Sequence, residues 1–438
     1  MNNRILSLTV AMVLALSTFA ASVETDRAWY LAGEAMKVSV TDDNALIAYA
    51  ELCDTRGLAA GIVIGLKEGE GTGVIELPSH LHSGYYVLSV YCRHNARVAH
   101  RLVAVVNPLR KSGDDDISWV EIKHPDSLSY SQTGERDYYR PGMGENFSDA
   151  DLVGEKDADV RETEGHIIKA RVRNVFDGNT YKGGQIHPSL SIIGKQIHYF
   201  EGKMVDDSTA VFYTYGIHGK RPLVLSAKLY TGESLPIEMI NPFATLLPKK
   251  LPHLVFHYKR SEVEARSLDM QRYQIAITPA KREVKLGDNA DDTAEEGVLL
   301  DYDDSAFGTK PYLSYNLDEY RQFFTIREVL IEYVKCVWNR KINGVQRLMV
   351  HAENEEFNNA LPTLVLIDGM PVSDIDRLLN YDARRIHHIN IYSGQYTFGN
   401  GVYSGILSFV TRSGRLTNYP IEPNMQYLVY DFPLNIEN

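Results

Sequence analysis

Short stretches of alternating or consecutive apolar residues follow one another along most of the chain and predict β-strands. In the first part of the chain they cover 35–40, 46–52, 85–92 and 98–106, and clusters of glycine, aspartate and asparagine separate them. Short strands at this spacing, joined by turn residues, are typical of an antiparallel sandwich. We therefore expect a β-sandwich over 23–110.

The strand pattern pauses over 111–164, which is polar, acidic and without apolar periodicity, and we interpret this stretch as a linker or an insertion. The pattern then resumes and predicts a second β-sandwich over 165–280. Three prolines over 241–252 exclude a regular central strand and mark a domain junction. The residues over 254–279 supply either further strands or a connecting segment.

Helical and strand-like patterns alternate in the last part of the chain and predict an α+β domain over 316–415, behind an acidic linker over 281–315. Apolar residues at spacings of three and four predict a helix over 318–338, capped by Asn316. A buried strand over 362–367, a short helix and two further strands follow. The expected fold class is thus mainly β with a C-terminal α+β domain.

Turn and loop motifs mark the ends of the strands in this last domain. Their residues are Asp368, Gly369, Pro371, Tyr392, Ser393, Gly394, Gly399, Gly401 and Gly405. The order of these motifs, from VLIDGMPV to GVYSGILSFVTRSG, resembles the plug domain of TonB-dependent outer-membrane receptors. The resemblance implies a domain shaped for the lumen of a large barrel. Because the sequence ends soon after Arg415, we expect a plug-like module without the roughly 200 or more residues of its own barrel.

Other motifs occur in the two predicted sandwiches. The phrases DRAWYLAGEAMKVSV, AYAELC and LPSHLHSGYYVLSVYC resemble the MG2 domain of the α2-macroglobulin family, with Ala32 in place of the usual proline before Gly33 and Glu34. The second sandwich is similar to carboxypeptidase-regulatory-like β-domains. Neither resemblance implies catalysis here, because the Cys-x-Glu-Gln thioester motif of the macroglobulin family does not occur in this sequence.

The N-terminus and the cysteines indicate where the protein resides. Residues 1–22 contain an arginine, an apolar run and then small residues, which predicts a cleaved secretory signal peptide. No later apolar run is long enough for a membrane helix. The signal peptide, together with the plug resemblance, implies a periplasmic protein, peripheral to the outer membrane. In this oxidising compartment Cys53 and Cys92, each at a predicted strand end, are a candidate disulfide pair. Cys336 is expected to be a buried thiol outside any disulfide.

Composition and motifs argue against several kinds of chemistry. The formal net charge of −12 provides no basic patch for nucleic acid and disfavours attraction to anionic lipid. No H-E-x-x-H, G-x-S-x-G or P-loop motif occurs, and the histidine pairs at 80/82 and 387/388 lack companions at metal-ligand spacing. We therefore expect a protein that is not an enzyme and has no cofactor and no metal site.

The stretch over 416–438 combines prolines with large apolar residues, among them Tyr427, Tyr430 and Phe432. It is expected either to return across its own domain as a final strand or to insert into a partner. The plug resemblance, in a chain without a barrel of its own, implies a protein whose plug-like domain docks on or occludes a large outer-membrane β-barrel from another chain. Such an architecture is similar to the separate plug subunit of the type IX secretion translocon. The alternative is a periplasmic macroglobulin-like binding or adhesion module without a barrel partner.

Overall fold

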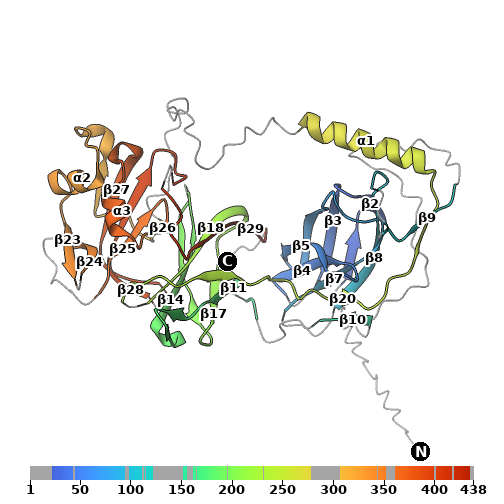
Figure 1. The fold of residues 1–438 in the computed structure, drawn as a ribbon, viewed down its shortest axis with the longest axis horizontal. Coiled ribbons are helices and arrows are strands. Elements are labelled where there is room, and N and C mark those ends of the chain that lie inside the picture. Colours follow the sequence, from blue (N-terminus) through green and yellow to red (C-terminus); the bar gives the residue numbers. More distant parts are fainter. Residues whose placement is uncertain are drawn as a thin grey trace, which may run out of the picture.

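The computed structural model describes residues 22–42, 45–93, 98–110, 113, 115–121, 151–154, 161–163, 165–194, 196–229, 231–277, 306–342, 344–351, 361–398, 401–416 and 419–434. Over these ranges the protein is mainly β, as predicted, and Figure 1 shows two β-sandwiches and an α+β domain in a row. The predicted signal peptide, apart from its last residue, lies outside the described residues. So do most of the acidic stretches over 111–164 and 281–315.

The first sandwich consists of two sheets that share one core. Its five-stranded sheet has the order β2 (Trp29–Leu31), β8 (Val98–Val106), β7 (Gly84–Tyr91), β4 (Ile47–Cys53) and β5 (Leu58–Gly65). Its three-stranded sheet has the order β1 (Ser22–Thr25), β3 (Ala35–Thr41) and β6 (Glu70–Glu76). Alternate residues of β3, such as Met36 and Val38, pack against Ala50 and Leu52 of β4 in this core. The four strands predicted for this region are confirmed.

The outer face of the five-stranded sheet is covered by segments from later in the chain. β9 (Ile117–Trp119) pairs in parallel with β21 (Leu254–Phe256), β10 (Leu152–Val153) pairs with β20 (Leu247–Pro248), and α1 (Arg260–Ile277) follows β21. Phe256 and Met270 of these segments pack against Trp29 and Val87. The residues over 254–277 therefore supply a strand and a helix to the first sandwich, whereas the sequence pattern grouped them with the second.

The second sandwich also has two sheets. One has the order β16 (Lys203–Met204), β17 (Thr209–Thr214), β11 (His166–Val172) and β19 (Ile237–Met239). The other has the order β15 (His198–Glu201), β14 (Ile186–Ile192), β18 (Gly219–Leu229) and β29 (Gln426–Phe432). A small hairpin of β12 (Val175–Phe176) and β13 (Asn179–Thr180) and the 3₁₀ turn η2 (Gly183–Gln185) precede β14. Ile168, Phe212, Leu190 and Leu225 meet in the shared core.

Strand β29 comes from the predicted tail and pairs antiparallel with β18, from Gly219 opposite Phe432 to Leu225 opposite Gln426. Neither alternative drawn from the sequence is correct. The tail forms a final strand, but it completes the second sandwich and does not cross the domain that precedes it.

The described part of the C-terminal domain contains a five-stranded sheet, two α-helices and a hairpin. The sheet order is β22 (Leu313–Asn316), β27 (Ile386–Phe398), β28 (Gly401–Thr411), β25 (Leu364–Ile367) and β26 (Met370–Pro371). The remaining elements are η4 (Leu317–Glu319), α2 (Ile326–Glu332), the hairpin strands β23 (Val337–Ile342) and β24 (Val345–Val350), α3 (Ile375–Leu379) and η5 (Ala383–Arg385). Val329 and Leu379 of the helices pack against Ile389 and Phe409 of the sheet.

The long helix predicted over 318–338 is wrong. Asn316 caps only the single turn η4, and α2 begins later, where Thr325 and Glu328 form a capping box. The helix ends before Tyr333, because the stretch that follows is rich in β-branched and aromatic residues and enters β23. Cys336 lies in the connection, with a φ of +65°, and is half-buried.

Candidate functional site

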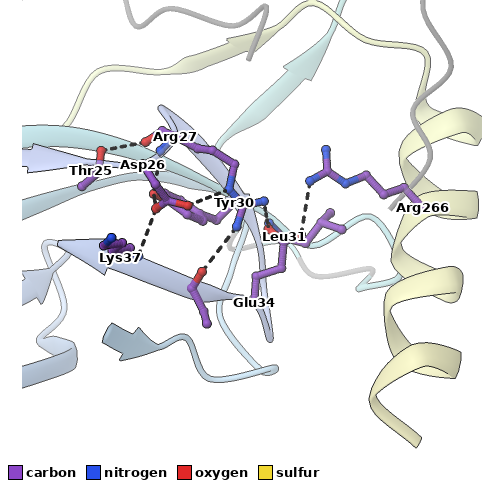
Figure 2. Close-up of polar contacts among 9 residues, drawn as sticks. Thr25, Asp26, Arg27, Tyr30, Leu31, Glu34, Lys37 and Arg266 are labelled. Atoms are coloured by element: carbon purple, nitrogen blue, oxygen red, sulfur yellow. Dashed lines mark hydrogen bonds and ion pairs between the residues drawn. The ribbon is translucent and has the colours of Figure 1, made fainter. Parts of the chain in front are cut away.

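The phrase DRAWYLAGE forms a polar cluster at the start of β2 (Figure 2). Asp26 accepts hydrogen bonds from the Tyr30 hydroxyl at 2.5 Å and from the backbone N–H of Lys37 at 3.0 Å. Glu34 accepts hydrogen bonds from the backbone N–H of Leu31 at 2.8 Å and from the Arg27 guanidinium at 3.1 Å. These residues of the MG2-like motif point at one another and fix the chain around a turn, so their role is structural.

The same cluster attaches helix α1 to the first sandwich. Arg266 of α1 donates a hydrogen bond to Glu34 at 3.2 Å (Figure 2). The Arg266 guanidinium also lies 4.5 Å from the centre of the Trp29 ring. Both members of this ion pair are buried. Sequence reasoning missed this contact because Glu34 and Arg266 are more than 200 positions apart.

The Asp-Gly turn of the plug-like motif lies between β25 and β26. Asp368 and Gly369 have φ values of +46° and +89°, as a two-residue hairpin turn requires. The buried Asp368 carboxylate accepts hydrogen bonds from the Thr411 N–H at 2.7 Å, the Thr411 hydroxyl at 2.6 Å and the Leu416 N–H at 2.7 Å. Burial raises the pKa of Asp368. A Cβ on Gly369 would meet Ile197 at 2.9 Å, so this turn packs directly on the second sandwich.

The other motif residues are also internal. Tyr392 is buried, and Pro371 pairs with Leu366 in the sheet. The predicted loop at Ser393 and Gly394 is instead an irregularity within β27, which continues to Phe398. A Cβ on Gly401 would lie 2.8 Å from Glu201 of the second sandwich. A Cβ on Gly405 would lie 2.9 Å from Val350 of the β23–β24 hairpin. Gly399 lies outside the described residues.

A partly buried polar cluster joins the C-terminal domain to the second sandwich. The carboxylate of Glu201 accepts hydrogen bonds from the hydroxyls of Tyr199 and Tyr403, each at 2.9 Å. Lys228 donates a hydrogen bond to the carbonyl of Val372 at 3.2 Å. Burial raises the pKa of both tyrosines and lowers the pKa of Lys228. The C-terminal domain therefore contacts the second sandwich both through close packing at Gly369 and Gly401 and through specific hydrogen bonds.

A second buried cluster joins both sandwiches and the tail. Glu162 accepts hydrogen bonds from the Tyr49 hydroxyl at 2.7 Å and from Arg93 at 3.1 Å, and it lies 3.1 Å from Nδ1 of His166. The other ring nitrogen of His166 lies 2.7 Å from the Tyr430 hydroxyl. Burial alone would raise the pKa of Glu162, but the contacts with His166, Arg93 and Tyr49 together hold it below its usual range.

The candidate disulfide between Cys53 and Cys92 is not formed. Strands β4 and β7 are antiparallel with Tyr49 opposite Tyr91 and Cys53 opposite Val87. Cys92 is therefore displaced from Cys53 by about five strand positions, roughly 17 Å, whereas a disulfide needs Cα atoms within about 7 Å. Both thiols are buried, and that of Cys92 points to Asp42 at 3.4 Å.

The tail residues proposed for partner contact divide between the two faces of β29. Tyr430 and Phe432 are buried in the core of the second sandwich, whereas Tyr427 is 45% exposed. Tyr430 and Phe432 thus serve the fold of this chain and do not lie on its surface, and a partner contact of Tyr427 stays a prediction.

Large apolar side chains remain exposed at the far side of the C-terminal domain. Phe324, just before α2, and Ile331 within it are 70% and 74% exposed. A shallow depression nearby is lined by Tyr320, Phe323 and Arg384, among others. Because Arg384 is already held by Asp382 at 2.7 Å, the exposed apolar residues are the stronger candidate for a contact with another molecule. Among the described helices, none has the length and apolarity needed to cross a bilayer.

Comparisons with known proteins identify no family for this chain. No protein-family model matches the sequence, and no curated protein matches it significantly. Among solved structures, the BSP domain of a biofilm-associated protein aligns with 52% of this chain and 30% of its own, at 11% identity and a TM-score of 0.17.

Trypsin-activated α2-macroglobulin from Escherichia coli aligns with 51% of this chain and 16% of its own, at 10% identity and a TM-score of 0.19. Methylamine-reacted α2-macroglobulin from Salmonella aligns with 52% of this chain and 15% of its own, at 12% identity and a TM-score of 0.18. This chain thus spans a third or less of the length of these three structures, and such loose alignments carry no argument about function. The resemblance to plug domains stays a prediction from the sequence.

Proposed function

We propose that this chain is a non-enzymatic, periplasmic interaction protein whose C-terminal domain docks on, or occludes, a large outer-membrane β-barrel formed by another chain. The observation that carries the proposal is the exposed pair Phe324 and Ile331. Phe324 directly precedes Thr325, the cap of α2, and Ile331 lies within α2. Large apolar groups at 70% and 74% exposure, at the start of one short helix and within it, support a surface that a partner covers.

The packing of the C-terminal domain supports this choice of surface. Its Asp-Gly turn and Gly401 are pressed against the second sandwich, so that side is occupied within the chain. Helix α2 lies at the opposite end of the domain from the second sandwich, at one end of the molecule (Figure 1). The order of motifs in this domain, which resembles a receptor plug, is the reason to propose a barrel as the partner.

The test is recovery of the tagged full chain from outer membranes in mild detergent, with mass spectrometry of co-purifying proteins. We expect one large barrel in stoichiometric amount. The double substitution Phe324→Asp and Ile331→Asp should lower its recovery at least tenfold, since buried interface anchors each contribute roughly 1–2 kcal/mol or more. The matched control is Val74→Asp with Val205→Asp, two exposed apolar residues in the sandwiches. Recovery of the protein alone from the soluble periplasm would overturn the proposal.

A second candidate is a binding or adhesion module that uses the second sandwich and has no barrel partner. Tyr213 and Tyr215 favour it, because both are more than half exposed on and just after β17. In that case Tyr213→Ala with Tyr215→Ala would abolish ligand or surface binding, and the Phe324/Ile331 variant would behave as the unaltered chain.

A further inference from the structure

The strand pair of β9 and β21 has an inner and an outer face, because side chains alternate along each strand. The inner face packs against the first sandwich and consists of Ile117, Trp119, Leu254 and Phe256. The outer face is exposed and consists of the residues that alternate with them, which are Asp116, Ser118, Val120, His253 and Val255.

Three residues of this outer face form a chain of polar contacts. The Oγ of Ser118 lies 2.7 Å from Nε2 of His253, and Nδ1 of His253 contacts a carboxylate oxygen of Asp116. The register of the two strands explains the arrangement, because it sets His253 beside Asp116, two positions before Ser118. Asp116 and His253 are 56% and 49% exposed, so water reaches both and burial does not force them together.

The contact with Asp116 determines which nitrogen of a neutral His253 carries the proton. An ionised carboxylate only accepts hydrogen bonds, so the proton lies on Nδ1. Nε2 is then the unprotonated nitrogen, and it accepts the hydrogen bond of the Ser118 hydroxyl. A serine hydroxyl bound to a histidine that a carboxylate orients is the arrangement that activates serine as a nucleophile.

Apolar side chains lie beside this serine on the same face. Val255 is paired with Ser118 across the two strands, and Val120 follows Ser118 by two positions. Both valines are exposed. An apolar chain attached to a reactive carbonyl at Ser118 would cover them, which removes apolar surface from water.

The backbone around Ser118 argues against efficient turnover. The N–H of Leu254 donates to the carbonyl of Asp116 at 3.2 Å. The N–H of Val120 donates to the carbonyl of Phe256 at 2.9 Å. These two donors are therefore not available to an oxyanion, and one such donor contributes roughly 100- to 1000-fold to acyl transfer. The site suits an ester with a good leaving group better than an amide.

We propose that Ser118 is an acylation site, which accepts one acyl group from an activated ester with an apolar chain. Oγ of Ser118 attacks the carbonyl carbon while Nε2 of His253 takes the hydroxyl proton. The Oγ–C bond forms, the bond from the carbonyl carbon to the leaving oxygen breaks, and His253 passes the proton to the leaving alcohol. Asp116 is a positioning residue that keeps Nε2 towards Ser118. The modification goes beyond the proposed function, because it needs no barrel.

The test exposes the full chain to two probes, an alkyl fluorophosphonate and p-nitrophenyl hexanoate. The first forms an Oγ–P bond and releases fluoride, and we expect its adduct on Ser118 in peptide mass spectrometry. The second should release p-nitrophenol in a burst of about one equivalent per chain and then slowly, since an acyl group accumulates on the serine. p-Nitrophenyl acetate should give a slower burst, because its short chain leaves Val255 uncovered.

Substitutions separate the three roles. Ser118→Ala should remove the adduct, and His253→Gln should slow its formation at least about 100-fold, the lower value for general-base assistance. Asp116→Asn should also slow it, and Asp116→Glu, which keeps a carboxylate, should recover most of the rate. The matched control is Ser314→Ala, because this exposed strand serine donates to the amide oxygen of Asn390 at 2.6 Å and not to a histidine.

Several results would overturn the acylation site. They are an adduct on another residue, no adduct at all, an unchanged rate in His253→Gln, and a loss in Ser314→Ala as large as that in Ser118→Ala. Equal rates for Asp116→Asn and the unaltered chain would overturn the positioning role. Because the substituted side chains are exposed, thermal unfolding of each variant should match that of the unaltered chain.

Discussion

One buried carboxylate connects three segments of the C-terminal domain. Asp368 holds Thr411 and Leu416 through three hydrogen bonds, from a turn that itself packs on the second sandwich. We expect Asp368→Ala to lower the free energy of unfolding by about 3 kcal/mol, because three donors lose their acceptor in a buried place. Urea unfolding measures this. Asp374→Ala, which removes the exposed cap of α3, should cost only about 1 kcal/mol, and equal effects of the two variants would contradict the prediction.

At this scale the sequence located residues well and their contacts poorly. Adjacent Asp and Gly predicted the turn correctly, because its φ values depend on local chemistry. The partners of Asp368 are 43 and 48 positions away, and no local pattern indicates them. The Cys53–Cys92 prediction failed for the same reason, since strand ends were recognisable but the antiparallel register that separates them was not.

Strand β29 allows a direct test at the scale of one element. Phe432 is buried in the second sandwich, and Tyr427 on the same strand is exposed. We expect Phe432→Ala to lower the free energy of unfolding by about 3–5 kcal/mol through the cavity it leaves, and Tyr427→Ala to change it by about 1 kcal/mol or less. Denaturant unfolding of the isolated chain provides the comparison. A tail that needed a partner to become ordered would show no difference between the two variants.

The strands were predicted better than the helix. Alternation and turn residues identified most strands, because both signals are local. Over 318–338 the apolar spacing predicts one long helix. The helix instead begins after the capping box of Thr325 and Glu328, and it ends where the β-branched stretch before β23 begins. The composition of the tail showed that it would be ordered. Its pairing with β18, more than 200 positions earlier, depends on tertiary packing that the pattern does not contain.

At the scale of the molecule, the Glu162 cluster links the two sandwiches and the tail. The contacts of the cluster hold the pKa of Glu162 in the folded protein below its pKa in the unfolded chain. The stabilisation that these contacts provide is therefore complete at pH values above the unfolded pKa, and it is lost as the pH falls through the folded pKa. We expect the free energy of unfolding to fall steeply below about pH 4.5, and less steeply in Glu162→Gln. At neutral pH this variant should lose about 3–5 kcal/mol, since Arg93 keeps a buried charge without its carboxylate.

The matched control is Glu264→Gln, on the partly exposed surface of α1, which should leave the acid slope unchanged. Parallel pH profiles for the unaltered chain and Glu162→Gln would refute the role of the cluster. No local pattern in the sequence indicates this link. Glu162 lies in the acidic stretch that the sequence pattern indicates to be a linker or an insertion. Its burial against Arg93 and His166 depends on how the two sandwiches are placed together.

The route of the chain imposes an order on its maturation. Until Gln426–Phe432 is available, β18 has an open edge and the core around Phe432 is incomplete. Those residues follow the whole C-terminal domain in the chain. The first strands of the second sandwich are therefore made early in synthesis, but this sandwich can be completed only after the C-terminal domain has been made. A nascent chain that stalls within the C-terminal domain would carry an unfinished middle sandwich with an unpaired strand edge, the kind of surface that invites aggregation.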